Sequence, residues 1–351
     1  MSDNLVISVD AMGGDNSPRV VIEGINIATK RNSDLRFLLF GDEGQIMPLL
    51  QQYPKVAKVS KVIHTTERVK NEDKPSQVIR NRNTSMYMAI EAVRSGRAQA
   101  IVSAGNTGAL MAISKMLLKT IHGIHRPAIC TIMPHIDGKY VMLDLGANTE
   151  CDEINLAEFA IMGNIFAKHA LGIKSPRVAL LNIGAEEMKG KEEIHHALKI
   201  LKNPQLDLKC TGYVEPHDIS NGVADVIVAD GFTGNVALKT IEGTAKFVVN
   251  MIKKSVKKSI FAKIGLPFML GVVRKIKRSM DPRNYNGAML VGLNGLTVKS
   301  HGGTDGIGYA VAIDNAAKLV RQNFVATIRQ EIEKVDLDEL NQESIYEGYY
   351  L

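Results

Sequence analysis

The stretch from Ala224 to Gly243, ADVIVADGFTGNVALKTIEG, decides the fold class of this chain. Its apolar, β-branched opening predicts a strand, and the apolar residues that follow the glycines have helical spacing. A strand that turns at glycines into a helix start favours an anion, because the first N–H groups of a helix lack partners within the helix. Gly234, Asn235 and Lys239 lie at or near this turn. We therefore predict that the segment binds an anion.

The same order of apolar run, small-residue turn and helical spacing recurs along the chain. Further examples are LVISVDAMGGD, FLLFGDEG, AIVSAGNTGALM, YVMLDLGANTE and VALLNIGAEEMKG. This alternation predicts a three-layer α/β/α fold, in which helices cover both faces of a mostly parallel sheet. Ligands of such folds bind at the carboxyl ends of the strands. We expect the turns to meet at one edge of the sheet and to form the functional site there.

The net charge of +6 is unevenly distributed over the 351 residues. The segment 245–280 contains ten Lys or Arg and no Asp or Glu, so the rest of the chain is net acidic. Its apolar residues recur at helical spacing, with an interruption at the GLP of residues 265–267. We predict a basic amphipathic helical hairpin, inserted into a single α/β domain that spans residues 1–335. Residues 336–351 form an acidic C-terminal tail that we expect at the periphery.

Two roles for the predicted hairpin stay open. It could pack in a dimer, with its lysines solvated. Alternatively, its apolar tip and basic flanks suit an anionic membrane or an acidic partner. The residues that would form this second surface are Ile260, Phe261, Leu266, Phe268, Lys254 and Lys257.

Composition and targeting signals narrow the setting of the protein. The three cysteines form no CxxC pair, and no His cluster has the spacing of zinc ligands, so we expect reduced thiols and no metal. We find no N-terminal signal peptide and no apolar run of about 20 residues, the length that would span a bilayer. A cytosolic location is therefore expected. The segment Val69–Met86 mixes charge and polar residues, which predicts a long exposed loop before a helix.

Common catalytic motifs are absent from the sequence. We find no GxSxG, HExxH, GxGxxG or GxxxxGK[ST] pattern, which disfavours the usual serine hydrolases, zinc proteases, dinucleotide-binding enzymes and P-loop proteins. The candidate functional residues must therefore come from the strand-end turns.

The turn DAMGGDNSP, residues 10–18, offers a carboxylate and two glycines. Asp10 ends the apolar run, and Gly13 and Gly14 allow the backbone to approach a ligand closely. Asn16 or Ser17 is expected to cap a helix whose first residue is Pro18. The pattern equally fits a well-capped turn without a ligand.

The other turns add polar residues of the same kind. SAGNTGAL, residues 103–110, places Asn106 and Thr107 at a predicted helix start, where N–H groups and the helix dipole favour an anion. His301 is a lone histidine, and a lone histidine is more often structural than catalytic. Lys189 is either a surface lysine or a phosphate clamp that a neighbouring carboxylate orients. The remaining candidates are Asn148, Asn182, Glu186, Lys189 and His301.

Eight motifs in sequence order closely resemble the PlsX family of acyl-acyl-carrier-protein:phosphate acyltransferases. They are DAMGGD, SAGNTGA, RPA, LDLGANTEC, LLNIGAEEMKG, GFTGNVALKTIEG, YNGAMLVGLNG and KSHG, and the resemblance extends from Ile7 to about Val320. One departure is HGGTDG, because the family more often has Ser or Ala after His-Gly.

The resemblance implies reversible transfer of a long-chain acyl group from acyl carrier protein to inorganic phosphate, which gives acyl phosphate for phospholipid synthesis. It also implies a fold similar to isocitrate and isopropylmalate dehydrogenases, a homodimer, and peripheral contact with the inner face of the membrane. A membrane glycerol-3-phosphate acyltransferase would consume the product. No cofactor and no nucleic acid are implied. Acyl carrier protein is acidic, and the basic residues expected to attract it are Arg80, Arg82, Lys253, Lys254, Lys257 and Lys258.

Phosphate is itself the nucleophile in this reaction, which agrees with the missing nucleophile motifs. The expected roles are therefore positioning and charge stabilisation. The glycine turns, Asn106, Thr107, Asn235 and Lys239 would hold phosphate or the carbonyl oxygen. Lys189 and His301 would stabilise the oxyanion or protonate the thiolate, with Asp10 and Glu186 orienting them.

Two other functions are alternatives to this one. A dehydrogenase of the isopropylmalate type would need an arginine-rich site and clustered aspartates for a metal, and no DxxxD pattern is evident near the strand ends. A scaffold without catalytic activity is the second, and production of acyl phosphate would exclude it.

Overall fold

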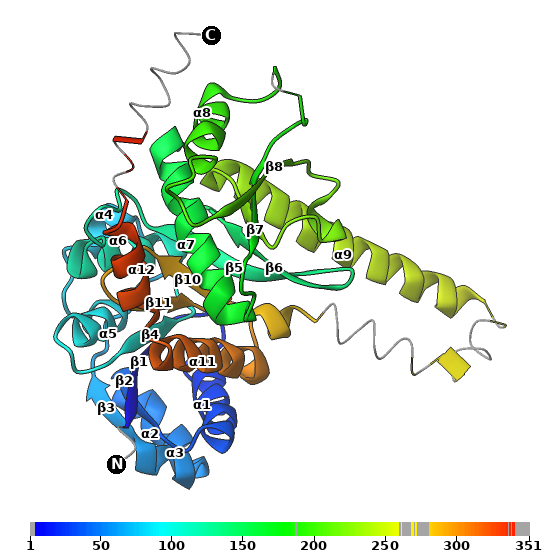
Figure 1. Cartoon of the computed structure of the whole chain (residues 1–351). Helices are drawn as coiled ribbons and strands as arrows, with labels where there is room; N and C mark the ends of the chain where they lie inside the picture. The colour runs from blue at the N-terminus through cyan, green and yellow to red at the C-terminus, as the bar shows by residue number, and fades with distance from the viewer. Residues whose placement is uncertain are drawn as a thin grey trace.

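Figure 1 shows the computed structural model, in which a single mixed sheet connects two lobes of the chain. The eleven strands lie in the order β3-β2-β1-β4-β11-β10-β5-β6-β9-β7-β8. The structure describes residues 4–186, 188–259, 261, 268, 269, 271, 281–335, 337, 339 and 340.

All six strands expected from the repeated pattern are present. One half of the sheet consists of strands from both ends of the chain. They are β1 (Leu5–Asp10), β2 (Leu35–Gly41), β3 (Ser60–His64), β4 (Ala100–Ser103), β10 (Ala288–Val291) and β11 (Leu296–Lys299). Those of the second half are β6 (Gly138–Leu143), β7 (Arg177–Leu181), β8 (Lys209–Val214) and β9 (Val226–Val228), and β5 (Ala128–His135) joins the halves.

The direction of the strands reverses at β5 and β6. Strands β1, β2, β3, β4 and β11 are parallel, β10 is antiparallel to β11 and β5, and β5 again runs with β1. A tight turn then pairs β5 with β6 in antiparallel register, from Thr131 with Met142 to His135 with Gly138. Strands β6, β9, β7 and β8 are parallel to one another. They therefore run opposite to β1, and their carboxyl ends lie at the other edge of the sheet.

Helices cover both faces of the sheet, as predicted. One face carries α1 (Arg19–Arg31), α2 (Glu43–Gln52), α3 (Pro54–Val59), α7 (Glu153–Leu171), α8 (Glu192–Leu201), α11 (Gly306–Arg321) and α12 (Phe324–Ile332). The other carries α5 (Ser85–Arg94), α6 (Thr107–Leu118), the 3-10 turn η1 (Ile219–Asn221) and the first part of α9 (Gly231–Lys258). The short α4 (Pro75–Val78) and η2 (Pro282–Tyr285) complete the described elements.

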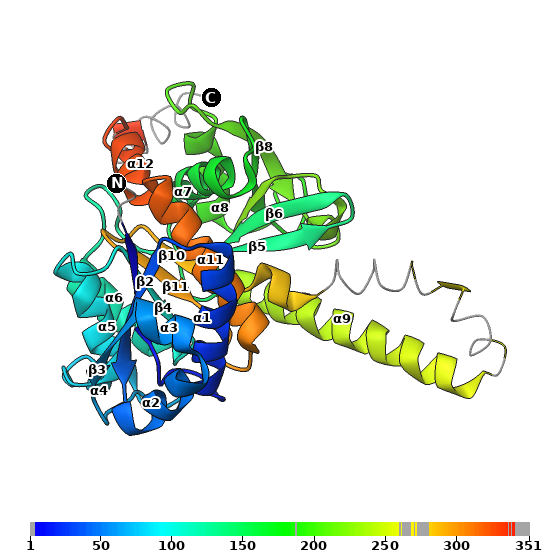
Figure 2. The same ribbon diagram turned by 90° about the horizontal axis from the view of Figure 1, so that it is seen from below.

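The two helical layers bury two apolar cores. Residues such as Ile22, Phe159 and Ile313 pack on one face, and Met86, Leu110 and Ile227 pack on the other. In Figures 1 and 2, α1 and α11 lie side by side, and their contact closes the layer over β1 and β4. This packing fixes the ends of β1, β4 and β11 relative to one another.

The basic segment is the continuation of a helix that starts at β9. Helix α9 runs without a break from Gly231 to Lys258, so no boundary exists at residue 245. The predicted glycine turn before it is also wrong, because Asp230 caps the helix and the glycines already lie in its first turns. Figure 2 shows the second half of α9 projecting from the body. The GLP interruption and the second helix of the predicted hairpin lie outside the described residues.

Three local predictions need correction or extension. Helix α1 begins at Arg19 with Pro18 as its N-cap residue, and no side chain caps it. The loop predicted over Val69–Met86 is exposed in large part, but it contains the single turn α4. Leu337 and Leu340 are buried against the core, so the packed domain continues beyond residue 335. The residues of the tail from 341 onward lie outside the described part.

Within the described ranges, the structure contains no helix that is both long and apolar enough to cross a bilayer.

Candidate functional site

The strand-end turns form two clusters and not one. The first cluster comprises the turns that follow β1, β4 and β11, namely residues 10–15, 103–107 and 299–303. The second cluster comprises the turns that follow β6, β7 and β9, namely residues 144–151, 182–191 and 230–235. The expectation that all turns share one edge is wrong, because the β5–β6 hairpin reverses the second half of the sheet.

Asp10 organises the first cluster from within. It is 1% exposed, and its carboxylate accepts hydrogen bonds from the hydroxyls of Ser85 at 2.6 Å and Ser103 at 2.7 Å. Burial raises the pKa of Asp10, and these hydroxyl donors oppose the rise. The side chain thus ties β1 to α5 and β4. Among the described residues, its hydrogen-bond partners include neither of the two residues that it was predicted to orient, Lys189 and His301.

Two glycines let the turns approach one another. A Cβ atom on Gly13 would lie 2.4 Å from Oδ2 of Asp10 and 2.7 Å from the backbone nitrogen of Gly105. Gly14 has a φ of +106° and packs beside Ala104 and the carbonyl oxygen of Gly302. Both glycines serve a close approach between turns of the protein itself, and their predicted approach to a ligand stays a prediction.

Asn106 lies at the start of a helix, as predicted, where it caps α6 and also holds the neighbouring loop. Its Oδ1 accepts from the backbone N–H of Ala109 at 3.0 Å, and its Nδ2 donates to the carbonyl of Asn71 at 2.9 Å. The amide is therefore engaged within the protein. The N–H groups of Thr107 and Gly108 have no acceptor within the helix, and both residues are exposed. A neutral cap leaves the positive end of the α6 dipole uncompensated.

His301 presents one free ring nitrogen at the first cluster. Its Nδ1 accepts from the N–H of Gly303 at 3.1 Å, and its backbone N–H donates to Oδ1 of the buried Asn286 at 2.9 Å. Because Nδ1 is an acceptor, the neutral ring carries its proton on Nε2. Among the described residues Nε2 has no hydrogen-bond partner, and the side chain is exposed. The Nε2–H group of His301 is thus available to donate a hydrogen bond to a ligand.

Lys299 is a residue of this cluster that the sequence reasoning missed. It ends β11, and its Nζ donates to the carbonyl of Ala104 at 3.3 Å and to the carbonyl of Ser300. Burial lowers the pKa of Lys299 to about 8, while the carboxylates of Asp10 and Asp15 act in the opposite direction. The available signal was a lysine at the end of the apolar run GLTV.

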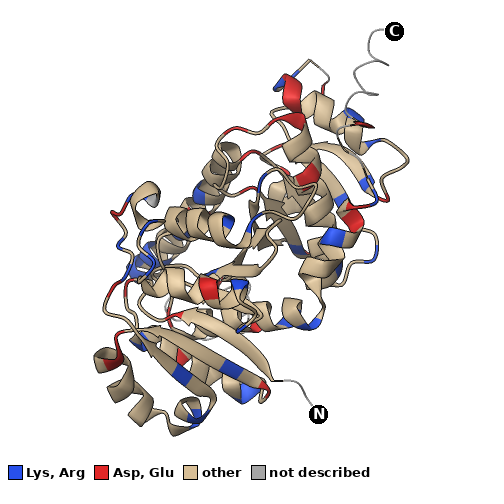
Figure 3. Ribbon diagram, turned by 90° about the vertical axis from the view of Figure 1, so that its left-hand side faces the viewer, with Lys and Arg blue, Asp and Glu red and all other residues tan. Residues whose placement is uncertain are grey.

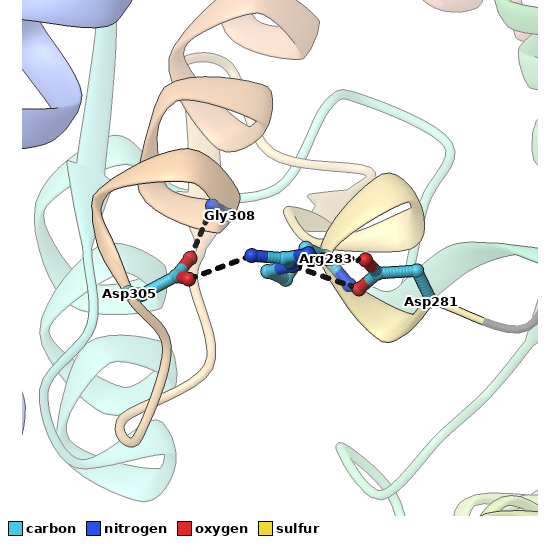
Figure 4. A network of polar contacts seen from close by, with 4 residues as sticks. All are labelled: Asp281, Arg283, Asp305 and Gly308. Atoms are coloured by element: carbon cyan, nitrogen blue, oxygen red, sulfur yellow. Dashed lines mark hydrogen bonds and ion pairs between the residues drawn. The ribbon is translucent and has the colours of Figure 1, made fainter. Parts of the chain in front are cut away.

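An ion-pair network connects the residues that follow segment 245–280 to the start of α11, beside the first cluster. Figure 4 shows Arg283 between Asp281 and Asp305, with its Nη1 at 2.9 Å from Oδ2 of Asp305. The other carboxylate oxygen of Asp305 accepts from the N–H of Gly308 and so caps α11. The start of α11, unlike that of α6, is therefore occupied by a carboxylate.

Asp144 organises the second cluster, and the sequence reasoning did not single it out. It is fully buried, and its carboxylate accepts from the backbone N–H groups of Ile129, Ala147 and Asn148 at 2.8–3.0 Å. The Nδ2 of Asn148 donates to the same carboxylate and to the carbonyl of Pro127. Burial raises the pKa of Asp144, and these N–H donors oppose the rise. The predicted ligand Asn148 is thus a structural bridge.

The start of α9 already holds an anion, the carboxylate of Asp230. Its Oδ1 accepts from the N–H of Thr233 at 2.7 Å, and its Oδ2 lies 3.0 Å from Nζ of Lys191. The N–H of Gly231 donates to the carbonyl of Asn148 at 2.7 Å. Gly234 serves a close contact, since a Cβ there would lie 1.9 Å from the carbonyl oxygen of Asp144. A bound phosphate at this helix start would face the carboxylate.

The other predicted donors of the second cluster also have protein partners. Asn235 donates to the carbonyl of Leu145 at 3.0 Å, and Asn182 donates to the carbonyl of Lys189 at 2.8 Å. Lys239 pairs with Glu242 at 2.9 Å. Lys189 pairs with Glu186 at 2.8 Å, both side chains being more than half exposed. The predicted contact of Glu186 with Lys189 is therefore present, on the surface and far along the chain from His301.

The described half of the projecting segment is basic and has exposed apolar residues. Lys254 and Lys257 are exposed, as are Phe247 and Ile252, with 66% and 55% of their surface accessible. Phe261 and Phe268 are 88% and 89% exposed, whereas Ile260 and Leu266 lie outside the described residues. Figure 3 shows the opposite side of the body, where acidic and basic residues are interspersed. The basic excess is thus local to the segment.

The described residues contain no group of three or more His, Cys, Asp or Glu that is arranged to hold a metal ion.

Comparison with known proteins adds relatives along nearly the whole chain. A family profile described as "Fatty acid synthesis protein" matches residues 5–327. A phosphate acyltransferase of Paramagnetospirillum magneticum is 46% identical over 349 residues, which cover 99% of both chains. That of Rhodospirillum centenum is 49% identical over 95% of both chains.

Solved structures of phosphotransacetylases share the fold at low sequence identity. The enzyme from Streptococcus pyogenes aligns with a TM-score of 0.60 at 17% identity, covering 92% of this chain and 95% of that one. The EutD phosphotransacetylase of Staphylococcus aureus aligns with a TM-score of 0.56 at 17% identity, covering 90% and 94%. Together with the eight motifs, the profile and the full-length relatives show that this chain belongs to the PlsX family of phosphate acyltransferases.

Proposed function

We propose that this acyltransferase moves a long-chain fatty acyl group reversibly from acyl carrier protein to inorganic phosphate. The product, acyl phosphate, supplies phosphatidic acid synthesis. The observation that carries the proposal is the first cluster, where the uncompensated start of α6 and the free Nε2 of His301 lie at the ends of neighbouring strands. Such a site offers donors for an anion and for a carbonyl oxygen, and it needs no protein nucleophile.

The chemical step follows from these donors. A phosphate oxygen attacks the thioester carbon, a C–O bond forms, and the C–S bond breaks to release the carrier thiolate. The N–H groups at Thr107 and Gly108 stabilise phosphate, and Nε2–H of His301 donates to the developing oxyanion or protonates the departing sulfur. Gly13 and Gly14 set the width of the site. The chemical step is assigned to the first cluster, because a phosphate at the start of α9 would meet Asp230.

A separate role is assigned to Lys189, Asn235 and Lys239. They belong to the opposite strand-end cluster, and Lys189 projects there from an exposed turn. We assign them to substrate contact at that edge, with Glu186 orienting Lys189. Activity of a folded Lys189→Ala variant tests this assignment directly.

Acyl carrier protein is the proposed acyl donor, and its acidic surface suits the basic part of this chain. Lys253, Lys254 and Lys257 are exposed on α9, and Arg80 and Arg82 are exposed between α4 and α5. Charge complementarity of this kind accelerates encounter and weakens as salt rises. We expect the Michaelis constant for the carrier substrate to rise between low and physiological salt. A constant that does not change with salt would contradict this role.

A homodimer that works at the inner face of the membrane is the proposed setting. The exposed Phe247, Ile252, Phe261 and Phe268 give the projecting segment an apolar surface beside its lysines. Interfacial segments combine these features, and membrane contact would bring acyl phosphate to a glycerol-3-phosphate acyltransferase in the bilayer. A Phe261→Glu, Phe268→Glu variant is expected to lose sedimentation with anionic vesicles while keeping its fold. Equal sedimentation of variant and parent would contradict the membrane contact.

The reaction itself is tested by thiol release from palmitoyl-acyl carrier protein with and without inorganic phosphate. Phosphate-dependent release, together with acyl hydroxamate after hydroxylamine trapping, is the expected result. Folded protein that releases no thiol from an authentic carrier substrate would overturn the proposed reaction and favour a scaffold.

A further inference from the structure

We propose that Lys299 binds the attacking phosphate, as the fixed cation of the first cluster. This inference rests on the proposed function and names the side chain that recognises the phosphate. Its basis is the position of the lysine, which ends β11 beside the ends of β1 and β4 and carries its ammonium group among their turns.

The ammonium group has one donor to spare. Lys299 donates to the carbonyls of Ala104 and Ser300, and a lysine ammonium has three N–H donors. Neither carbonyl carries a full charge. The carboxylates of Asp10 and Asp15 act on Lys299 electrostatically, yet neither forms a described ion pair with it. A phosphate oxygen would therefore supply both the third acceptor and a direct countercharge.

The surroundings of the ammonium group are suited to a small tetrahedral anion. Ala104, whose carbonyl holds Lys299, directly precedes Gly105 and the cap of α6. Gly14 and Gly302 lie against each other, and the N–H of Asp15 donates to the carbonyl of Gly302 at 3.0 Å. The ammonium group thus contacts the turn that leads from β4 into α6. Two independent sources of positive potential, a side chain and a helix dipole, favour an anion there.

The titratable groups that face this position allow a specific pH test. On the β1 side they are Asp10 and Asp15, and Tyr309 of α11 lies near Asp10 with its hydroxyl bonded to the carbonyl of Val102. On the β4 side the register partner of Lys299 is Ser103, whose hydroxyl does not titrate in this range. Lys299 has a pKa lowered to about 8, so phosphate binding should weaken once this ammonium group loses its proton. An arginine keeps its charge at that pH, and this difference isolates the side chain.

The experiment measures inorganic phosphate binding by titration calorimetry and the Michaelis constant for phosphate in thiol release. Lys299→Met, Lys299→Arg and the exposed control Lys115→Met are compared with the parent, and circular dichroism checks the fold of each. Loss of a charge-assisted hydrogen bond predicts a phosphate dissociation constant about 10- to 100-fold higher in Lys299→Met. The parent should lose affinity about tenfold per pH unit above pH ~8, and Lys299→Arg should bind without this break.

The outcomes separate this inference from the proposed reaction. If the parent releases thiol with phosphate and Lys299→Met keeps a phosphate constant within about twofold of the parent, the inference fails and the reaction stands. If the parent releases no thiol, the proposed reaction fails, and calorimetry with phosphate alone still decides the binding role of Lys299. Equal loss in Lys115→Met, or an unchanged break in Lys299→Arg, would overturn the inference as well.

Discussion

The two strand-end clusters arise from the same sequence pattern but differ in electrostatics. In the first, α6 is capped by the neutral Asn106, and the half-buried cation Lys299 has only carbonyl oxygens as direct acceptors. In the second, α9 is capped by the carboxylate of Asp230, which also neutralises Lys191. The buried Asp144 is likewise saturated with N–H donors. The first cluster can therefore accept an anion, whereas the second is satisfied by the protein.

A glycine-rich turn before a helix is therefore a weak indicator of a ligand. The identity of the cap decides whether the positive end of the helix dipole remains available. An Asp cap supplies its own negative charge, and an Asn cap does not. The variants below test whether one cluster is structural and the other functional.

Removal of the Asp144 carboxylate is expected to have the largest effect on stability. Asp144→Ala leaves the N–H groups of Ile129, Ala147 and Asn148 without their acceptor, and the first of these is buried. We expect the free energy of unfolding to fall by at least about 3 kcal/mol, as measured by urea denaturation. The exposed Asp137→Ala in the β5–β6 turn is the control. A loss below about 1 kcal/mol would show that Asp144 does not hold the second cluster together.

A methyl group at Gly13 should damage the first cluster. In Gly13→Ala the Cβ would lie 2.7 Å from the backbone nitrogen of Gly105, which cannot move as a side chain could. We expect a loss of about 1–3 kcal/mol in stability and a larger, at least tenfold, loss of turnover. Gly243→Ala in α9 is the matched control, because its Cβ meets nothing within 4 Å and alanine favours a helix. Normal turnover in Gly13→Ala would refute the close-approach argument.

Lys299 should make a pH-dependent contribution to stability. Its pKa is about 8 in the folded chain and 10.5 ordinarily, so between these values the unfolded chain binds more protons. Stability then rises with pH across this window and falls as pH drops through 8. Relative to Lys299→Met, the parent should gain about 1–3 kcal/mol between pH 8 and 10.5 in urea denaturation. Parallel pH curves for the two proteins would indicate that Lys299 has an ordinary pKa.

The exposed pair of Lys189 and Glu186 should contribute least to the fold. Both side chains are mostly in solvent, where an ion pair is screened. We expect Tm of Lys189→Ala to change by less than about 1 °C in a thermal melt. Any loss of activity in this variant would then report on function. A clear drop in Tm would instead assign Lys189 a structural role in the second cluster.

Local sequence patterns predicted much of the fold. The apolar runs before the glycines are all strands, helices cover both faces, and Asn106 lies at the start of α6 as expected. These features depend on the spacing and chemistry of neighbouring residues, which a sequence displays directly. The absence of a nucleophile motif was also informative, since the family that the chain belongs to uses phosphate as acceptor.

The composition of the site was less accessible to the sequence. Asn148, Asn182 and Asn235 have polar side chains in glycine turns, as a ligand site would, but their amides hold backbone carbonyls. Lys299 resembles any lysine after a strand until its burial is known. Hydrogen-bond partners and desolvation depend on residues far along the chain, so composition and spacing did not reveal them.

Short motifs and local periodicity were enough to indicate six of the eleven strands, the start of α6 and the family of this protein. Only the tertiary structure decided that the turns divide between two edges of the sheet. The decisive element is the two-residue turn of Ile136 and Asp137, which joins β5 and β6 as an antiparallel hairpin. Because of this hairpin, Lys299 lies at one edge of the sheet, and Asp144 and the start of α9 lie at the other. Local motifs do not reveal this division, because strand direction is set by hydrogen bonds between segments remote in sequence.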